Sequence, residues 1–205
     1  MTFNGLQLVT SPGRVMTPRP STERLVAAAR AHIGDGAARV VDVGTGSGAV
    51  AIAIATACAD AEVWATDTSA DAVALARANV RRHRLGDRVS VRHGDLLAPL
   101  DGLFDVIAAN LPYVPASAAA RYPELQAEPF DAVFAAGDGL EAYRRLVDAA
   151  RTRLADGGVL LLQLNRRLVA AGRNELPALE GVLAASRSAQ GPAAAVVEAI
   201  VGKAA

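Results

Sequence analysis

Residues 40–48, Val-Val-Asp-Val-Gly-Thr-Gly-Ser-Gly, decide the predicted fold of this 205-residue chain. Three of the first four residues are valines, which is typical of a strand covered on both faces of a parallel sheet. Three glycines then alternate at positions 44, 46 and 48, and glycine lets a ligand approach the backbone closely. The apolar run 49–55 follows as a predicted helix. A strand, a glycine-rich turn and a helix N-terminus in this order favour a nucleotide-binding cradle.

Asp42 narrows the choice among the possible ligands of this cradle. The spacing of Gly44, Gly46 and Ala49 fits the dinucleotide fingerprint, so NAD is one candidate, and a tight turn without a ligand is another. However, an acid two residues before the first glycine disfavours a pyrophosphate and favours a cation. The pattern Asp-x-Gly-x-Gly-x-Gly resembles motif I of the class I methyltransferases, whose cofactor S-adenosylmethionine carries a sulfonium and an ammonium group. The predicted cofactor loop comprises Asp42, Gly44, Thr45, Gly46, Ser47 and Gly48.

Length and composition predict a single α/β domain over 1–205, with a lead-in segment at 1–36 and a core at 37–205. The formal net charge is zero, so no global basic field favours nucleic acid. The basic run 81–84 is read as a solvated helix end, with a local basic patch as the alternative. No signal peptide and no apolar run of about 18 residues stand out, which predicts a cytoplasmic protein without a membrane span.

Two further predicted strands end in acidic residues. The strand 62–67 ends at Asp67, which lies 25 residues after Asp42 and suits the hydroxyls of a ribose, with Thr68 beside it. The alternative for Asp67 is a helix cap, but Ser69 can cap the predicted helix 70–84 by itself. The strand 88–92 leads to Asp95 and Leu96, which could contact an adenine amino group and ring. An exposed turn is an equal alternative for that pair.

The fourth strand, 104–109, runs directly into Asn110-Leu111-Pro112-Tyr113. With the preceding motifs in this order, the chain resembles methyltransferases that modify a planar nitrogen. Within them it is similar to the release-factor glutamine N5-methyltransferases, the HemK family, over about residues 3–163. Residues 18–23 look like that family's P-R-P-E-T-E, and residues 128–140 look like its E-P and G-G-x-D-G-L region. The resemblance implies a protein substrate such as a release factor.

The tetrapeptide 110–113 offers the chemistry that an amide substrate needs. An amide nitrogen is a poor nucleophile, because its lone pair is delocalised into the carbonyl. The Asn110 side-chain oxygen and the Leu111 carbonyl can each accept one N–H and orient the lone pair. Pro112 stiffens the turn, and Tyr113 offers a face for a planar group. Asn110 is also expected to contact the cofactor. The alternative is an ordinary β-turn, since Asn and Pro are common turn residues.

Several departures from the family keep a second substrate class open. Leu111 stands where release-factor enzymes usually carry proline, and the same N-L-P-Y occurs in dimethyladenosine rRNA methyltransferases. Adenine N6-methylation is therefore the alternative activity. Residues 163–165 read Q-L-N where the long branch of the family has E-I-G. The chain looks like the short branch, whose members work with a small zinc-binding activator subunit. No spacing of His or Cys predicts a metal site in this chain itself.

The predicted architecture is a Rossmann-like, doubly wound sheet of seven strands, mostly parallel, with helices on both faces. Glycine 86 is expected to end the helix 70–84. Ser21 or Thr22 is expected to cap the first helix, and the proline-bearing loop 114–130 is expected to be a substrate lid. An antiparallel strand near 193–201 is predicted at the sheet edge. The other elements expected are helices at 22–33, 140–154 and 166–176 and strands at 158–165 and 182–189.

Overall fold

The computed structural model describes residues 1–165 and the backbone of 196–202. Its centre is a sheet in which the six described strands all run parallel, in the order β10-β9-β6-β3-β4-β5. The chain passes from β3 outward to β5 and then returns to place β6 on the other side of β3. The strands are β3 (Ala38–Val43), β4 (Ala61–Asp67), β5 (Val89–His93), β6 (Phe104–Ala109), β9 (Leu154–Asn165) and β10 (Val196–Gly202).

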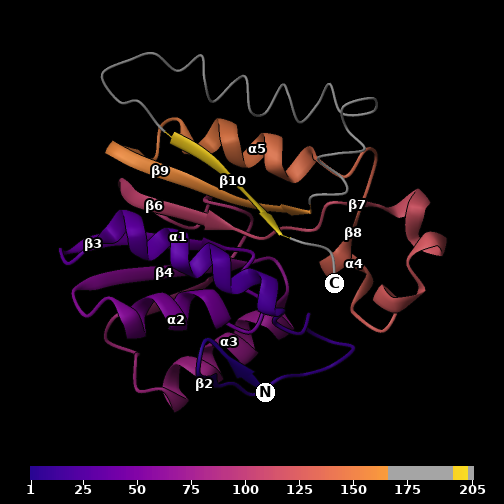
Figure 1. The fold of residues 1–205 in the computed structure, drawn as a ribbon, viewed down its shortest axis with the longest axis horizontal. Coiled ribbons are helices and arrows are strands. Elements are labelled where there is room, and N and C mark those ends of the chain that lie inside the picture. Colours follow the sequence, from indigo (N-terminus) through magenta and orange to yellow (C-terminus); the bar gives the residue numbers. More distant parts are fainter. Residues whose placement is uncertain (166–195, 203–205) are drawn as a thin grey trace.

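Helices cover both faces of the sheet (Figure 1). One face carries α1 (Glu23–Ile33), α2 (Ala49–Ala57) and α3 (Ala70–Arg82), and the other carries α5 (Glu141–Ala150). The first seven residues of α2 are all apolar and buried, because this helix packs between the sheet and its neighbours. In α5, by contrast, apolar residues recur on one side and charged residues on the other, as in a helix with one solvent face. The predicted doubly wound class is therefore confirmed.

The direction of the edge strand was predicted wrongly. β10 pairs with β9 in parallel, from Val196 opposite Val159 to Gly202 opposite Asn165. The prediction took this strand and the expected strand 182–189 as neighbours at the sheet edge. The connection between β9 and β10 is residues 166–195, which exceeds the dozen or so residues that a parallel crossover needs. The predicted helix 166–176 and strand 182–189 lie outside the described residues.

Two helix ends also differ from the prediction. Arg84, with φ of 57°, adopts the left-handed conformation after α3, so the helix ends before Gly86 is reached. The second helix, α5, ends at Ala150 instead of 154. The chain then turns back toward the sheet, where the Phe104 amide donates to the Arg153 carbonyl. Leu154 therefore begins β9. The strand expected at 158–165 therefore begins earlier, and residues 156–158 lie inside β9, where the register with β6 shifts.

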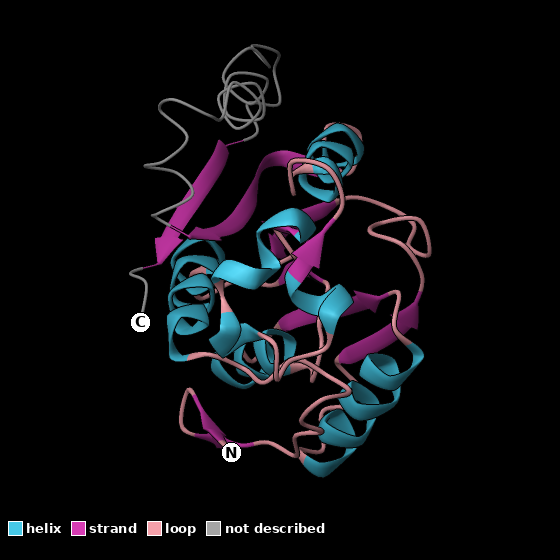
Figure 2. Ribbon diagram, turned by 90° about the vertical axis from the view of Figure 1, so that its right-hand side faces the viewer, coloured by secondary structure: helices cyan, strands magenta, loops and turns pink. Residues whose placement is uncertain are grey.

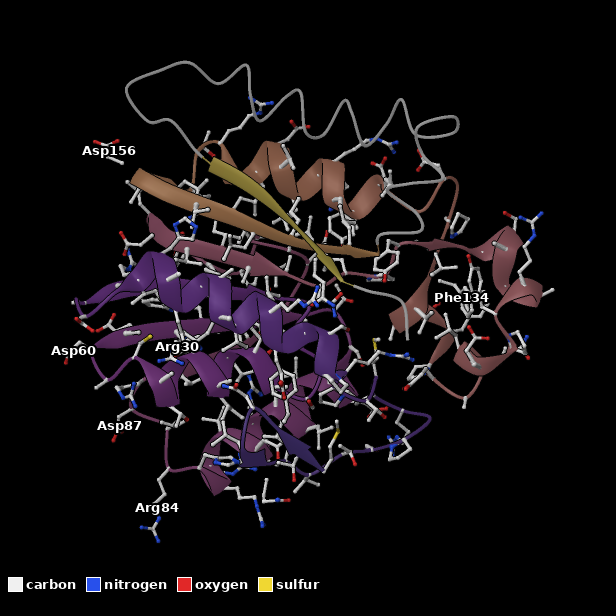
Figure 3. All side chains as sticks on the ribbon, viewed as in Figure 1. Arg30, Asp60, Arg84, Asp87, Phe134 and Asp156 are labelled. Atoms are coloured by element: carbon white, nitrogen blue, oxygen red, sulfur yellow. The ribbon has the colours of Figure 1, made fainter. Side chains whose placement is uncertain are left out.

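The segment 114–135 forms a small lobe beyond the ends of β6 and β9, rather than an irregular loop (Figures 1 and 2). Val114 pairs with Phe134 across a short parallel ladder, and a separate apolar cluster includes both residues. Figure 3 shows Phe134 within this lobe. The lobe contains β7 (Val114–Pro115), η2 (Ala116–Arg121), η3 (Pro123–Leu125), α4 (Phe130–Val133) and β8 (Phe134–Ala135).

The N-terminal part adds a small hairpin and a 3-10 turn before α1. The elements are β1 (Thr2–Phe3), β2 (Leu6–Gln7) and η1 (Pro20–Thr22). Asn79 on α3 fixes this part of the chain: its side chain accepts from the Val9 amide at 2.9 Å and donates to the Val9 carbonyl at 3.0 Å. No helix within 1–165 is long and apolar enough to cross a membrane.

Candidate functional site

The glycine loop 44–48 lies at the point where the strand order reverses. β3 pairs with both β4 and β6, and its last partners are Thr66 and Ala109. Loops that leave β3 and β6 therefore emerge side by side, in the crevice where open α/β sheets bind ligands. Gly44, Gly46 and Gly48 all have positive φ, of 72°, 56° and 83°. The local conformation thus requires the three glycines that the sequence singled out.

The Asp42 side chain is buried below this loop, with only 2% of the residue exposed. Its Oδ2 accepts a hydrogen bond from the Thr45 hydroxyl at 2.6 Å and another from the Ala51 amide at 3.2 Å. Burial raises the pKa of the carboxyl from 3.8 to about 6, and the two hydrogen bonds only partly oppose this. Asp42 therefore organises the loop from beneath and carries its charge at neutral pH.

The raised pKa of Asp42 predicts an unusual pH dependence of stability. Because the folded protein binds this proton more tightly than the unfolded chain, the free energy of unfolding should fall as pH rises from about 4 to about 6 and then stay level. The contribution approaches about 3 kcal/mol. Urea unfolding across this range should show the slope, and Asp42→Asn should remove it. An identical pH profile for the variant would contradict the assignment of the pKa.

Asp67, at the end of β4, reaches across to the same loop. Its Oδ2 accepts from the Gly46 amide at 2.8 Å and its Oδ1 accepts from the Ser69 amide at 2.9 Å. Ser69 caps α3, because its hydroxyl accepts from the Ala72 amide, as the sequence predicted. Each carboxylate oxygen can accept a further hydrogen bond, so Asp67 retains capacity for a ligand. Thr68 follows, with its carbonyl 2.9 Å from His93 Nε2.

Asp95 is engaged differently from the other acids. Its carboxylate forms an ion pair with Arg145 of α5, and Leu96 next to it has φ of 47° and packs against the core beneath α5. A hollow of about 240 Å³ lies between residues 95–98 and α5, and no residue of the glycine loop lines it. The adenine contacts expected of Asp95 and Leu96 stay a prediction, since this ion pair already occupies the carboxylate.

The turn 110–113 follows β6 directly and meets the glycine loop. A Cβ atom added to Gly44 would lie 2.7 Å from Leu111 Cδ2, so the buried Leu111 side chain packs onto the loop at close range. Asn110 Nδ2 donates to the Thr22 hydroxyl at 3.4 Å. Thr22 makes no side-chain cap on α1, and Ser21 lies inside η1. The expected helix cap was therefore wrong, and the threonine hydroxyl contacts the turn instead.

Tyr143 of α5 is a site residue that sequence reasoning missed. Its side chain is fully buried, and its hydroxyl accepts from the Leu111 amide at 3.0 Å. The same hydroxyl lies 3.0 Å from the Leu111 carbonyl and 2.8 Å from the Gln163 carbonyl. The available signal was a tyrosine on the apolar face of an amphipathic helix, since a buried hydroxyl needs a polar partner.

Asn79 is a second polar residue that was missed. It is fully buried on α3, and Nδ2 donates to the Ser47 carbonyl at 2.9 Å as well as to Val9. It therefore ties the glycine loop to the N-terminal segment. The signal was its position among Ala72, Val73, Ala76 and Val80, the apolar face of its helix.

The lobe is linked to the lead-in segment through Glu128. This carboxylate accepts from the Thr17 amide at 3.1 Å and lies 3.8 Å from Arg19. The segments 17–23 and 114–130, which are far apart in sequence, therefore lie side by side. This arrangement places them at the crevice and keeps the lid function of 114–130 as a prediction.

Comparison with known proteins agrees with this geometry. Residues 20–123 match the family described as methyltransferase small domain. A release factor glutamine methyltransferase from Gloeobacter violaceus is 42% identical over 79% of this chain and 58% of its own length. A ribosomal protein uL3 glutamine methyltransferase from Bradyrhizobium diazoefficiens is 42% identical over 51% of this chain and 34% of its own length. The chain thus spans less than two thirds of the length of these relatives.

A solved structure shares the fold. The ribosomal protein L11 methylase from Lactobacillus delbrueckii subsp. bulgaricus superposes with a TM-score of 0.51 and 25% identity, over 69% of this chain and 58% of that one. The resemblance to glutamine methyltransferases that the motifs predicted is confirmed by the relatives above. On the match over residues 20–123, the chain belongs to the methyltransferase small domain family.

Proposed function

We propose that the crevice binds S-adenosylmethionine through the glycine loop, Asp42 and Asp67. Two observations support the fit. The three loop glycines have positive φ and no side chain, so a ligand can approach the loop backbone closely. Each carboxylate oxygen of Asp67 accepts one hydrogen bond and can accept another. Asp42 supplies negative charge to the side of the loop where a sulfonium and an ammonium would lie. Thr68, Asp95 and Leu96 are the proposed ribose and adenine neighbours. The cofactor supplies an electrophilic methyl group on a sulfonium.

Removing the Asp67 carboxylate should weaken cofactor binding strongly. Asp67→Ala is expected to lower the affinity for S-adenosylmethionine by about 1.5–3 kcal/mol, the range for hydrogen bonds to a charged group. Calorimetric titration measures this. Asp71→Ala is the matched control, because it removes the same charge nearby and breaks only an exposed ion pair with Arg14. Equal affinities in the wild type and Asp67→Ala would contradict the ribose assignment, as would binding of NAD as tight as that of S-adenosylmethionine.

The proposed activity is methyl transfer to the side-chain nitrogen of a glutamine in a protein. The observation that carries it is the side chain of Asn110: its Nδ2 donates to Thr22, and none of the described residues donates to its Oδ1, which can therefore accept from a substrate. Asn110 Oδ1 and the Leu111 carbonyl would each accept one N–H of the substrate amide. As the nitrogen gains positive charge, both hydrogen bonds strengthen. The N–C bond would form as the S–C bond breaks and a neutral thioether leaves, so no base is needed before transfer; the cationic nitrogen would then give up one N–H proton to water.

Pro112 and Tyr113 complete the acceptor side of the proposed site. Proline fixes its own φ and so limits the turn after Leu111. Tyr113 lies between the core beneath α5 and the apolar cluster of the lobe, where its ring can face a planar substrate group. The lobe and the linked segment 17–19 would exclude water from the reacting nitrogen.

The proposed substrate is a release factor or a similar translation protein, since the relatives include both release factor and uL3 glutamine methyltransferases. A small activator subunit is the second proposed partner. Adenine in nucleic acid is the less favoured acceptor, because the chain has no net positive charge to hold a phosphate backbone.

The test is incubation of the chain with methyl-labelled S-adenosylmethionine and purified release factors, uL3 or ribosomal RNA, with and without a candidate activator subunit. Label on a glutamine side chain is expected, identified by mass spectrometry of the digested protein. Label found only on adenine would overturn the proposal. The proposal would also fail if the Asn110→Ala variant methylated the protein substrates at the wild-type rate.

A further inference from the structure

Tyr143 places one hydroxyl against the backbone of the proposed acceptor turn. The Leu111 amide belongs to the peptide group shared with Asn110, and the Leu111 carbonyl belongs to the peptide group shared with Pro112. The hydroxyl contacts both groups, each at 3.0 Å. Because it touches both peptide planes that flank one Cα atom, it restrains both backbone dihedral angles of Leu111.

The third contact of the hydroxyl anchors the turn to the sheet. The Gln163 carbonyl, 2.8 Å away, is in β9, the strand that pairs with β6 next to the turn. A hydroxyl has one proton and two acceptor sites. It accepts from the Leu111 amide and shares its single proton between the Leu111 and Gln163 carbonyls. The Leu111 carbonyl oxygen has two lone pairs, so one remains for a substrate N–H. Burial raises the pKa of Tyr143 well above its ordinary value, so the proton stays on the oxygen.

Packing alone does not explain this hydroxyl. The ring of Tyr143 lies in an apolar cluster beside Leu146, Leu160 and Leu162, where phenylalanine would fill the same space. A hydroxyl in such surroundings is unfavourable unless it is hydrogen-bonded. Its three hydrogen-bond contacts with the described residues all go to the turn or to the end of β9 beside it.

We propose that Tyr143 is a positioning residue for methyl transfer, which holds the Leu111 carbonyl and Asn110 in the geometry that accepts the two N–H groups of an amide substrate. The inference rests on the proposed function of the turn. Tyr143 touches neither substrate nor cofactor in this scheme. It acts through the backbone of Leu111, so its loss should affect the rate of transfer rather than the binding of S-adenosylmethionine.

The test compares Tyr143→Phe with the wild type in two measurements. Single-turnover methyl transfer to a glutamine-containing substrate should slow at least about tenfold per folded molecule, since small misplacements of reacting groups cost up to 10²-fold. The dissociation constant of S-adenosylmethionine should change less than about threefold, because Tyr143 acts on the acceptor turn and does not touch the cofactor. Independently of activity, hydrogen exchange of the Leu111 amide should accelerate relative to amides in the middle of β3, because its acceptor is gone.

Leu146→Ala is the matched control, since Leu146 is equally buried on the next turn of α5 and has only apolar packing to lose. It should lower the melting temperature at least as much as Tyr143→Phe but keep the rate per folded molecule and the protection of Leu111. A Tyr143→Phe variant with wild-type rate and wild-type Leu111 protection overturns the inference, as does an equal loss of rate in Leu146→Ala. If the wild type methylates no glutamine substrate, the proposed function fails, and the exchange data alone decide whether Tyr143 holds the turn.

Discussion

Replacement of Asn110 by alanine is expected to reduce kcat for methyl transfer by about 10²–10³, the scale for the loss of one preorganised polar contact. The reason is that the Asn110 oxygen acts on a nitrogen whose charge develops during transfer. Binding of S-adenosylmethionine should change much less, because the glycine loop, Asp42 and Asp67 are held by contacts that do not involve Asn110. Single-turnover rates, cofactor titration and a melting curve are measured on the same preparation.

Thr22→Val tests the same contact with a smaller expected effect. Valine keeps the shape of threonine and removes the hydroxyl that accepts from Asn110 Nδ2. The Asn110 oxygen stays present but loses its orientation, so a smaller loss of rate is expected than in Asn110→Ala. A merely structural turn would behave otherwise: Asn110→Ala would melt at a lower temperature and keep its full rate per folded molecule, and that outcome would refute the mechanism.

The strand, the glycine turn and the positions of the residues around it could be predicted from the sequence, because these signals are local. Asp42 and the glycines at 44, 46 and 48 act within one strand and one turn, and their positive φ angles follow from residue type. Asp67 could be placed because parallel strands present their carboxyl ends at one edge of a sheet. Asn110 could be placed at the same edge because it directly follows the predicted strand 104–109. All of these predictions needed only the order of the strands and the residue types at their ends.

Features that depend on distant contacts were missed or misjudged. Nothing in residues 193–201 shows whether the strand they contain returns parallel or antiparallel, because direction depends on the connection before it. Thr22 looks like a cap in sequence, yet its hydroxyl contacts a turn 88 residues away. Asp95 looks free in a His-Gly-Asp turn until α5 brings Arg145 to it. In the sequence, Tyr143 is only one member of the apolar face of a predicted helix. Its hydrogen bonds to Leu111 become visible only when α5 is packed against the turn.

Gly139 is the second position where a single substitution should have a large effect. Gly139 has φ of 88°, and an added Cβ would overlap the Tyr113 carbonyl oxygen and lie 2.9 Å from the Tyr113 carbonyl carbon. Both atoms are backbone, so the strain cannot be relieved by a side-chain rotation. Gly139→Ala should therefore displace Tyr113 and the end of the turn 110–113.

The expected result for Gly139→Ala is a loss of about 10² in the rate of methyl transfer per folded molecule, on the argument that a displacement near 1 Å at a reacting group has that effect. Gly137→Ala is a closely matched control. Gly137 also has positive φ, of 60°, but an added Cβ there meets nothing within 4 Å. It should be destabilised by about 1–2 kcal/mol through backbone strain alone and should transfer methyl groups at the wild-type rate.

The comparison separates backbone strain in the segment 137–139 from displacement of the turn, since both variants introduce the same methyl group at positive φ. Rates are corrected for the folded fraction, which is taken from thermal melts of each variant. If Gly137→Ala and Gly139→Ala lose activity equally, the contact with Tyr113 does not set the geometry of the acceptor site. If only Gly139→Ala loses activity, the close approach of Gly139 to Tyr113 sets the geometry of the acceptor site, in addition to the contact of Tyr143 with Leu111.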